Sequence, residues 1–280
     1  MRMNRTKQNV RKIALYAGLI LIALVQLFPL YWLFTFSLKD NMQIFTTNPL
    51  GLPNPYRFEN FADVLQRGQV ASFLLNSLLV TTATIAVSTV LSTMAAYAIA
   101  RMKWKWSNTA LLFFLMGMMI PLHATLVPLF IFLKRTNLYD TPFALILPYV
   151  AFAIPMAIYI FVGFFKTIPA EMEEAACLDG MSIYGIFVKI MVPLIRPAIA
   201  TVAIFTYLSC WNELMFAISF ISKPQWKTLT VGIMGMVGMY ATNWGALGAG
   251  LVVATVPTLI IYLLMSGEIQ KSFTTGAIKG

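Results

Sequence analysis

Charged residues are scarce in this sequence. Lys, Arg, Asp and Glu make up 11% of its 280 residues, whereas hydrophobic residues make up 59% and the mean hydropathy is +0.78. A soluble globular domain carries roughly 25% charged residues, because its surface must face water. The composition therefore excludes a soluble enzyme, a secreted domain and a disordered tail, and it indicates an integral membrane protein.

Cysteine and histidine are also rare, and their scarcity excludes several kinds of site. The two cysteines, Cys177 and Cys210, are far apart in apolar or helical contexts and indicate no disulfide framework. His123 is the only histidine, which excludes a multi-histidine metal site and an H-E-x-x-H enzyme motif. The sequence also lacks a G-x-x-x-x-G-K-S/T phosphate loop, so we do not expect this chain to hydrolyse ATP.

Long uncharged runs are present instead. A helix needs about 20 apolar residues to cross a bilayer, and the first run is too long for the roughly 7–15-residue apolar core of a signal peptide. The stretch 228–245 is rich in glycine and is expected to be a loop or a short re-entrant segment. We predict an all-α integral membrane protein with six transmembrane helices, at about 13–38, 70–100, 106–133, 141–165, 197–222 and 246–266.

The basic residues are distributed unevenly along the chain. The net charge of +10 would suggest nucleic-acid binding in a soluble protein. Here, 13 of the 20 Lys and Arg residues lie at the N-terminus, in the second and fourth connections and in the C-terminal tail. Because basic residues concentrate on the cytoplasmic side of a membrane protein, we predict that both termini are cytoplasmic. We attribute the charge to orientation in the lipid bilayer and expect no nucleic-acid partner.

The connection between the fourth and fifth spans is acidic. It holds four of the ten Asp and Glu residues of the chain. Pro169 suits the first turn of a helix, and three glutamates follow at the positive end of the helix dipole. Gly180 suits the left-handed residue that commonly ends a helix. We therefore predict a helix, a sharp turn and a second helix over about 182–191, which Pro193 should end.

This connection has the chemistry of a docking element. Ala175 and Ala176 would let a partner approach closely, the carboxylates could pair with basic groups, and Phe187 could anchor the second helix to the bundle. A solvated loop helix with incidental acidic charge is the alternative interpretation.

The same residues resemble a known motif. Glu174-Ala175-Ala176, followed by Asp179-Gly180 and later by Val192-Pro193-Leu194 and Pro197, is similar to the EAA loop of bacterial ABC-importer permeases, with Val192 in place of the usual leucine. Further stretches are similar to the carbohydrate-uptake, maltose-transporter-type branch of this binding-protein-dependent family. They are Asn76-Ser77, Ala95 to Arg101, Ile120-Pro121, Trp211-Asn212-Glu213, Thr228 to Gly232 and the ending Gly276 to Gly280.

The resemblance implies a multi-pass permease subunit of the bacterial cytoplasmic membrane, which is not an enzyme and binds no cofactor directly. It implies a second homologous permease subunit, expected as a heterodimer, two ABC subunits that bind ATP and Mg²⁺, and an extracytoplasmic solute-binding protein. The expected solute is a mono- or oligosaccharide. A permease of the same family for glycerol phosphate, peptides or amino acids is an alternative, as is an ion-coupled secondary transporter, although the spans hold few ionisable residues.

The resemblance also divides the chain and assigns site residues. We expect a cytoplasmic N-terminus at 1–12, a permease domain at 13–267 with a core of about 71–267 and a coupling loop at 166–197, and a cytoplasmic tail at 268–280, shortened before Gly276. The residues expected to couple to the ATPase are Glu171, Glu174, Ala175, Ala176, Asp179, Gly180 and Phe187.

The candidate substrate-pathway residues are Asn212, Glu213 and His123. Glu213 and His123 stand out because ionisable groups inside spans are costly. The alternatives are that Glu213 lies near the outer interface and bonds to the backbone, and that His123 is a hydrogen-bonded packing residue.

Overall fold

The computed structural model describes the backbone of residues 5–66, 69–238 and 242–277, and within these ranges the side chains of residue 9 and of residues 11–267. These residues form helices and turns, and no strand occurs within these ranges. The α-helices are α1 (Arg5–Ser37), α2 (Glu59–Gln66), α3 (Val70–Arg101), α4 (Ser107–Gly117), α5 (Leu126–Arg135), α6 (Phe143–Phe165), α7 (Glu171–Leu178), α8 (Ile183–Ile186), α9 (Val192–Leu194), α10 (Arg196–Trp211), α11 (Met215–Phe220), α12 (Leu229–Met234) and α13 (Trp244–Ala277).

Four short turns complete the described secondary structure. Two are 3₁₀ turns, η2 (Leu122–Thr125) and η4 (Pro224–Trp226), and two are π turns, η1 (Gln43–Thr47) and η3 (Phe187–Met191). The all-α prediction is therefore confirmed for the described residues.

Four helices of the described chain are long and apolar enough to cross a membrane: 11–37, 70–101, 143–165 and 244–267. Two helix pairs meet the same criterion but are sharply bent, at 86° between Ser107–Gly117 and Leu122–Arg135 and at 72° between Ile183–Leu194 and Arg196–Trp211. The number of candidate spans is thus four, or up to six when each bent pair is counted as one.

The third and fifth predicted spans are therefore not single straight helices. The third is interrupted after Gly117, where Pro121 takes an extended conformation (φ −64°, ψ 119°) before η2. Proline lacks a backbone N–H and disfavours helical geometry at the preceding residue, which explains the break. The fifth ends at Trp211, and a separate short helix, α11, starts at Met215.

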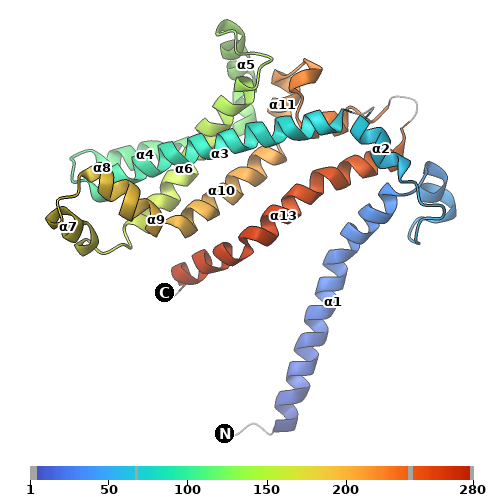
Figure 1. Ribbon diagram of the computed structural model, residues 1–280, viewed down its shortest axis with the longest axis horizontal. Helices are drawn as coiled ribbons and strands as arrows, with labels where there is room; N and C mark the ends of the chain where they lie inside the picture. The colour runs from blue at the N-terminus through green and yellow to red at the C-terminus, as the bar shows by residue number, and fades with distance from the viewer. Residues whose placement is uncertain (1–4, 67–68, 239–241, 278–280) are drawn as a thin grey trace. The chain divides into compact units, whose positions relative to one another are not determined.

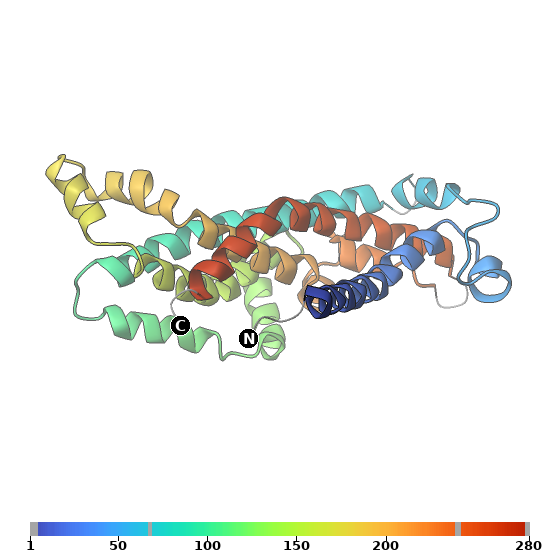
Figure 2. The ribbon, with the colours of Figure 1, turned by 90° about the horizontal axis from the view of Figure 1, so that it is seen from below.

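The chain divides into two compact units, residues 1–70 with 233–255 and residues 71–232 with 256–280. In the second unit, α4 and α10 pack against α6 (Figures 1 and 2). Figure 1 shows α7 and α8 together at the end of α3 that leads into α4. The core at this end includes Ala157, Ile158, Phe161 and Phe165 of α6, which have no exposed surface. The helix α7 packs against this end of the unit through Ala176.

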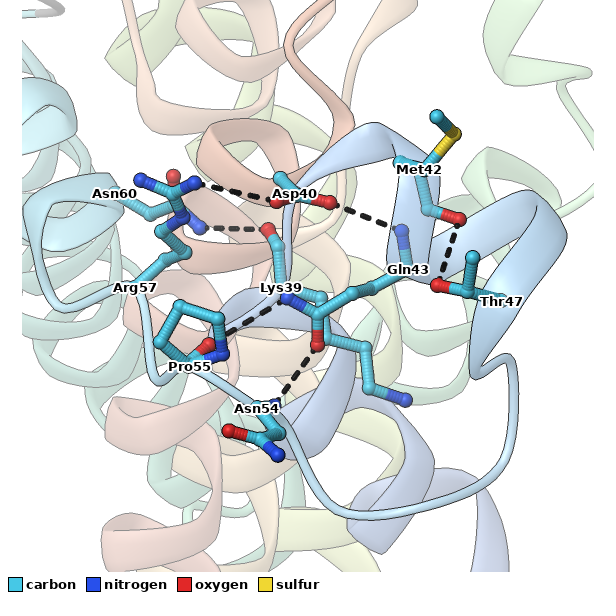
Figure 3. Close-up of polar contacts among 9 residues, drawn as sticks. All are labelled: Lys39, Asp40, Met42, Gln43, Thr47, Asn54, Pro55, Arg57 and Asn60. Atoms are coloured by element: carbon cyan, nitrogen blue, oxygen red, sulfur yellow. Dashed lines mark hydrogen bonds and ion pairs between the residues drawn. The ribbon is translucent and has the colours of Figure 1, made fainter.

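The first unit contains the loop between α1 and α2. Hydrogen bonds and an ion pair among the residues of this loop stabilise its conformation (Figure 3). Lys39 is buried, and its Nζ donates to the carbonyls of Asn48 (2.7 Å) and Pro49 (3.1 Å). Burial lowers the pKa of the Lys39 ammonium. The Gln43 N–H donates to Asp40 Oδ1 (2.9 Å), and this bond holds the pKa of the Asp40 carboxyl below its usual range.

Glycine permits the close approach of α13 to the end of α1 within this unit. A Cβ at Gly245 would lie 2.1 Å from the Lys39 carbonyl oxygen, and a Cβ at Gly248 would lie 2.4 Å from the Phe36 ring. The Lys39 carbonyl also accepts a hydrogen bond from Asn60 Nδ2 (2.9 Å). Small residues let helix backbones approach closely in membranes, and these two glycines serve that purpose here.

Candidate functional site

The connection between α6 and α10 folds as a helix, a sharp turn and a second helix. The first helix, α7, begins at Glu171, so Pro169 lies just before the helix and not in its first turn. It ends at Leu178, and Gly180 follows in the left-handed conformation (φ +77°) that the sequence predicts. The Gly180 N–H donates to the Cys177 carbonyl (3.0 Å) and the Met181 N–H to the Ala176 carbonyl (3.0 Å). These bonds close the end of α7.

The second helix is longer than predicted, because it passes Pro193. It begins at α8, where Ser182 Oγ accepts a hydrogen bond from the Gly185 N–H (3.3 Å). It continues through the π turn Phe187–Met191 into α9, which holds Pro193 in its first turn. Local π adjustments can re-satisfy the backbone groups that a proline frees inside a helix, which explains why the helix continues past Pro193. The chain bends only after Leu194.

The helix α7 has two faces of different character. Glu174, Ala175, Leu178 and Asp179 are exposed, as is Glu171 at its start. Ala176 is only 4% exposed and belongs to the hydrophobic core of the second unit. The two alanines of the motif thus do different things: Ala175 leaves a shallow outer surface, whereas Ala176 lets α7 lie close to this chain's own helices.

Glu173 lies on the inner side of α7 and contacts α3. Its Oε1 accepts a hydrogen bond from the Tyr97 hydroxyl (2.8 Å), and its Oε2 forms an ion pair and a hydrogen bond with the Arg101 guanidinium. We call Tyr97, Arg101 and Glu173 the α3–α7 brace. These three residues were not predicted from the sequence as site residues. The signal available in the sequence was the spacing of Tyr97 and Arg101, which places them on one face of a helix.

Large apolar side chains are exposed on the outer side of this connection. Leu178 is 90% exposed and Tyr184 is 80% exposed, and Met172 and Ile183 are exposed nearby in the sequence. These residues lie outside the four straight candidate spans, and neither Leu178 nor Tyr184 was predicted from the sequence as a site residue. The sequence did contain a sign that Leu178 is exposed, because its spacing places it on the same face of α7 as Glu171 and Glu174. Phe187 turns inward, with its ring centroid 5.1 Å from that of Tyr97.

A polar cavity of about 790 Å³ lies beside α7. Lys103, Lys105 and Lys166 line it together with Glu173 and Glu174. The three lysines are exposed. The connection therefore exposes carboxylates together with the apolar side chains of Leu178 and Tyr184. The polar cavity with its three lysines lies next to the α3–α7 brace.

Glu213 occupies the turn between α10 and α11. Its carboxylate accepts hydrogen bonds from the N–H groups of Phe216 (2.8 Å) and Ala217 (3.1 Å) and from the Tyr149 hydroxyl (2.6 Å). The backbone bonds satisfy two of the free N–H groups at the start of α11. The Glu213 carboxylate thus bonds to the backbone, and Tyr149 is a further partner that the sequence did not indicate.

The three candidate pathway residues do not line one cavity. Glu213 lines a largely apolar cavity of about 330 Å³, with Tyr149, Phe152 and Ser209, and neither Asn212 nor His123 is among the described residues that line it. Asn212 is exposed, and its Nδ2 donates to the Leu208 carbonyl (2.8 Å). His123 is exposed in η2. Within the described chain, no three His, Cys, Asp or Glu side chains are grouped so as to hold a metal ion.

A family model described as "binding-protein-dependent transport system inner membrane component" matches residues 88–270, which is more than half of the chain. This chain belongs to that family. It is a transport permease subunit and not an enzyme, and it is a multi-pass protein of the cytoplasmic membrane. The matched range contains Arg101, all of α7 and the turn at Glu213.

The permease has relatives along almost its whole length. It is 34% identical over 276 residues to the probable ABC transporter permease protein YurM of Bacillus subtilis (strain 168), covering 99% of this chain and 91% of the relative. It is 33% identical over 256 residues to the trehalose transport system permease protein SugB of Mycobacterium tuberculosis (strain CDC 1551 / Oshkosh), covering 91% and 93%.

Another relative is the sulfoquinovosyl glycerol transport system permease protein SmoH of Agrobacterium fabrum (strain C58 / ATCC 33970), which is 34% identical over 255 residues, covering 91% and 89%. The permease also resembles a subunit of a crystallised bacterial ABC transporter involved in the import of the acidic polysaccharide alginate. The TM-score is 0.83 at 20% identity, with 96% of this chain and 100% of that chain covered. At this identity the likeness shows the fold.

Proposed function

We propose that the permease forms half of the translocation pathway of an ATP-driven sugar importer, and that the exposed side of α7 and α8 is where an ATPase subunit docks. The observation that carries the docking proposal is Leu178, a leucine with 90% of its surface exposed in a segment outside the straight spans. Exposed apolar surface rimmed by polar residues is typical of a protein–protein interface. Glu171, Glu174 and Asp179 supply that rim.

The coupling site, as proposed, has parts with different tasks. Leu178 and Tyr184 fill apolar hollows on the ATPase, Ala175 allows close approach, and the exposed carboxylates pair with basic groups. Gly180 sets the angle between α7 and α8. Ala176 and Phe187 hold the element against its own unit. ATP and Mg²⁺ would be bound by the two ATPase subunits, and their closure would move α7.

The proposed solute is a mono- or oligosaccharide delivered by an extracytoplasmic binding protein. Relatives named for trehalose and sulfoquinovosyl glycerol transport support this choice over glycerol phosphate, peptides or amino acids. A second, homologous permease subunit would complete the pathway as a heterodimer, with six spans in each subunit and both termini in the cytoplasm. An ion-coupled mechanism is less favoured, because the carboxylate of Glu213 already accepts three hydrogen bonds.

Reconstitution of the complete transporter tests this function. The permease is co-expressed with its partner permease and ATPase subunits, placed in proteoliposomes, and assayed with the binding protein and a panel of radiolabelled sugars. We expect uptake of at least one sugar that requires ATP inside the vesicles and stops when ATP is omitted. Uptake driven by a proton or sodium gradient without ATP would contradict the proposal, as would ATP-dependent uptake of amino acids or glycerol phosphate alone.

The cavity beside Glu213 is proposed to border the pathway. Glu213→Ala removes two backbone hydrogen bonds and the bond from Tyr149, and loss of a helix cap alone costs about 0.5–2 kcal/mol. We expect lower sugar uptake at equal abundance in the membrane. Asn212→Ala is the matched control, because its exposed side chain bonds only to the neighbouring turn. Unchanged uptake by Glu213→Ala would remove this residue from the pathway.

A further inference from the structure

The docking surface and the surface that attaches α7 to the membrane helices are separate. Glu174, Ala175 and Leu178 face outward and are exposed. Glu173 lies on the inner side, and Ala176, three residues further along the helix, is buried. Residues three apart lie on the same face of a helix. A partner that covers the outer face of α7 would therefore leave the contact between Glu173 and α3 in place.

The brace is a strong local attachment. Its ion pair is mostly shielded from water, since the Arg101 and Glu173 side chains are 12% and 18% exposed. Arg101 contacts Glu173 Oε2 through both Nε and Nη2, and charge-assisted hydrogen bonds of this kind are stronger than neutral ones. Tyr97 adds a hydroxyl bond to the second oxygen of the same carboxylate. Both oxygens of Glu173 are thus held by residues of a single membrane helix.

Arg101 also connects a third segment to the brace. Its Nη1 donates to the carbonyl of Ile168 (2.9 Å) and, over a longer distance, to that of Phe165 (3.4 Å) at the end of α6. The Tyr97 ring packs edge-on against Phe165 with the centroids 5.7 Å apart, and it also contacts Phe187 of the second helix. The brace therefore ties α3, the end of α6 and both helices of the coupling connection into one packed group.

Formation of α7 does not require this arrangement. Glu171 and Glu174 also lie in the first turn, where a carboxylate interacts favourably with the helix dipole whether or not it has an ionic partner. The particular contribution of Glu173 is its contact with Tyr97 and Arg101. Without that contact, α7 would be attached to α6 through the turn 166–170 and to α3 only by apolar packing.

We propose that the α3–α7 brace makes α3 follow the displacement of α7, so that Tyr97, Arg101 and Glu173 are positioning residues for the conversion of ATPase closure into movement of a membrane helix. This inference rests on the proposed function, because it requires an ATPase that moves α7. It goes beyond docking by assigning the transmission of the movement to a helix, α3, that lies outside the coupling connection.

The experiment measures the sugar taken up per ATP hydrolysed by the complete transporter in proteoliposomes. For Arg101→Gln and Glu173→Gln, we expect wild-type amounts of co-purified ATPase and continued ATP hydrolysis. We expect uptake per ATP to fall by about tenfold, because removing one partner of a shielded ion pair leaves the other uncompensated. Tyr97→Phe, which removes one hydroxyl and keeps the ring, should lower the ratio by about two- to threefold.

Glu174→Gln is the contrasting variant for Glu173→Gln, since the two glutamates are adjacent in the same turn and only Glu174 is exposed. Because Glu174 belongs to the docking surface, this variant should reduce ATPase co-purification, whereas Glu173→Gln should not. The double variant Arg101→Gln/Glu173→Gln should lose no more than the worse single variant, because coupled residues are not additive. If the charged variants fail to accumulate in the membrane, Tyr97→Phe alone decides the question.

The proposed positioning role would be overturned if uptake per ATP were unchanged in all three single variants. It would also be overturned if hydrolysis and uptake fell in parallel, or if Glu173→Gln lost the ATPase from the complex. Failure of the proposed function would look different, because the wild-type transporter itself would then show no ATP-dependent sugar uptake.

Discussion

Gly180→Val is expected to reduce sugar uptake by at least about tenfold, with the subunit still present in the membrane. Gly180 has φ +77°, a conformation in which a β-branched side chain clashes with its own backbone. A Cβ at this position would meet no other atom within 4 Å, so the expected defect is one of backbone angle and not of packing. The turn would open, and α8 would leave α7 in a different direction.

The measurement is ATP-dependent uptake at matched abundance, with ATPase co-purification as a second readout. Gly180→Asn is the control, because asparagine adopts the left-handed conformation more readily than other residues with a side chain. We expect this variant to retain most of the transport. Normal uptake together with normal co-purification in Gly180→Val would contradict the assignment of the turn to coupling.

Leu178→Asp is expected to separate the ATPase from the permease and to abolish uptake. Burying a leucine contributes about 1.5–3 kcal/mol, and a carboxylate placed in the same apolar hollow would add a desolvation cost. The permease itself should fold normally, because Leu178 is 90% exposed and contributes little to its own core. Co-purification of the ATPase in detergent, followed by uptake in vesicles, measures both effects.

Leu178→Met is the control for this change, since methionine keeps the apolar volume and adapts to irregular hollows. It should retain the ATPase and most of the uptake. The two predictions differ in a useful way, because Gly180→Val alters the direction of the coupling element while Leu178→Asp removes its anchor. If Leu178→Asp retains a stoichiometric ATPase, the apolar contact lies elsewhere, and Tyr184 becomes the next candidate.

Much of the fold follows from hydropathy and turn chemistry. The uncharged runs around 13–38, 70–100, 141–165 and 246–266 became long helices, since a run of that length and composition has few other stable forms in a membrane. The left-handed Gly180 was predictable because only glycine adopts that conformation without strain. The sharpness of the bends could not be predicted. An apolar run around Pro121 has the same composition whether the helix continues or turns by 86°.

The site was predictable in its position but not in its orientation. The acidic helix with its terminal glycine was located from the sequence, but the sequence gives no reason to place Ala175 outside and Ala176 inside. That distinction depends on how α7 is rotated against α3 and α6, which contacts far apart in the sequence determine. The sequence likewise does not distinguish Glu173 from the other glutamates of the first turn, and its contacts with Tyr97 and Arg101 do.

The π turn Phe187–Met191 affects which side of the helix the residues after it occupy. A π turn accommodates one more residue than an α-helical turn, and successive residues of an α-helix are rotated by about 100°. Deleting one residue here would restore α-helical winding and leave the residues that follow, including Arg196–Trp211, on nearly the same side relative to α7. A one-residue deletion within α10 would instead rotate the rest of that helix by about 100°, so the π turn is the position in this segment where the loss of one residue changes the buried face of α10 least.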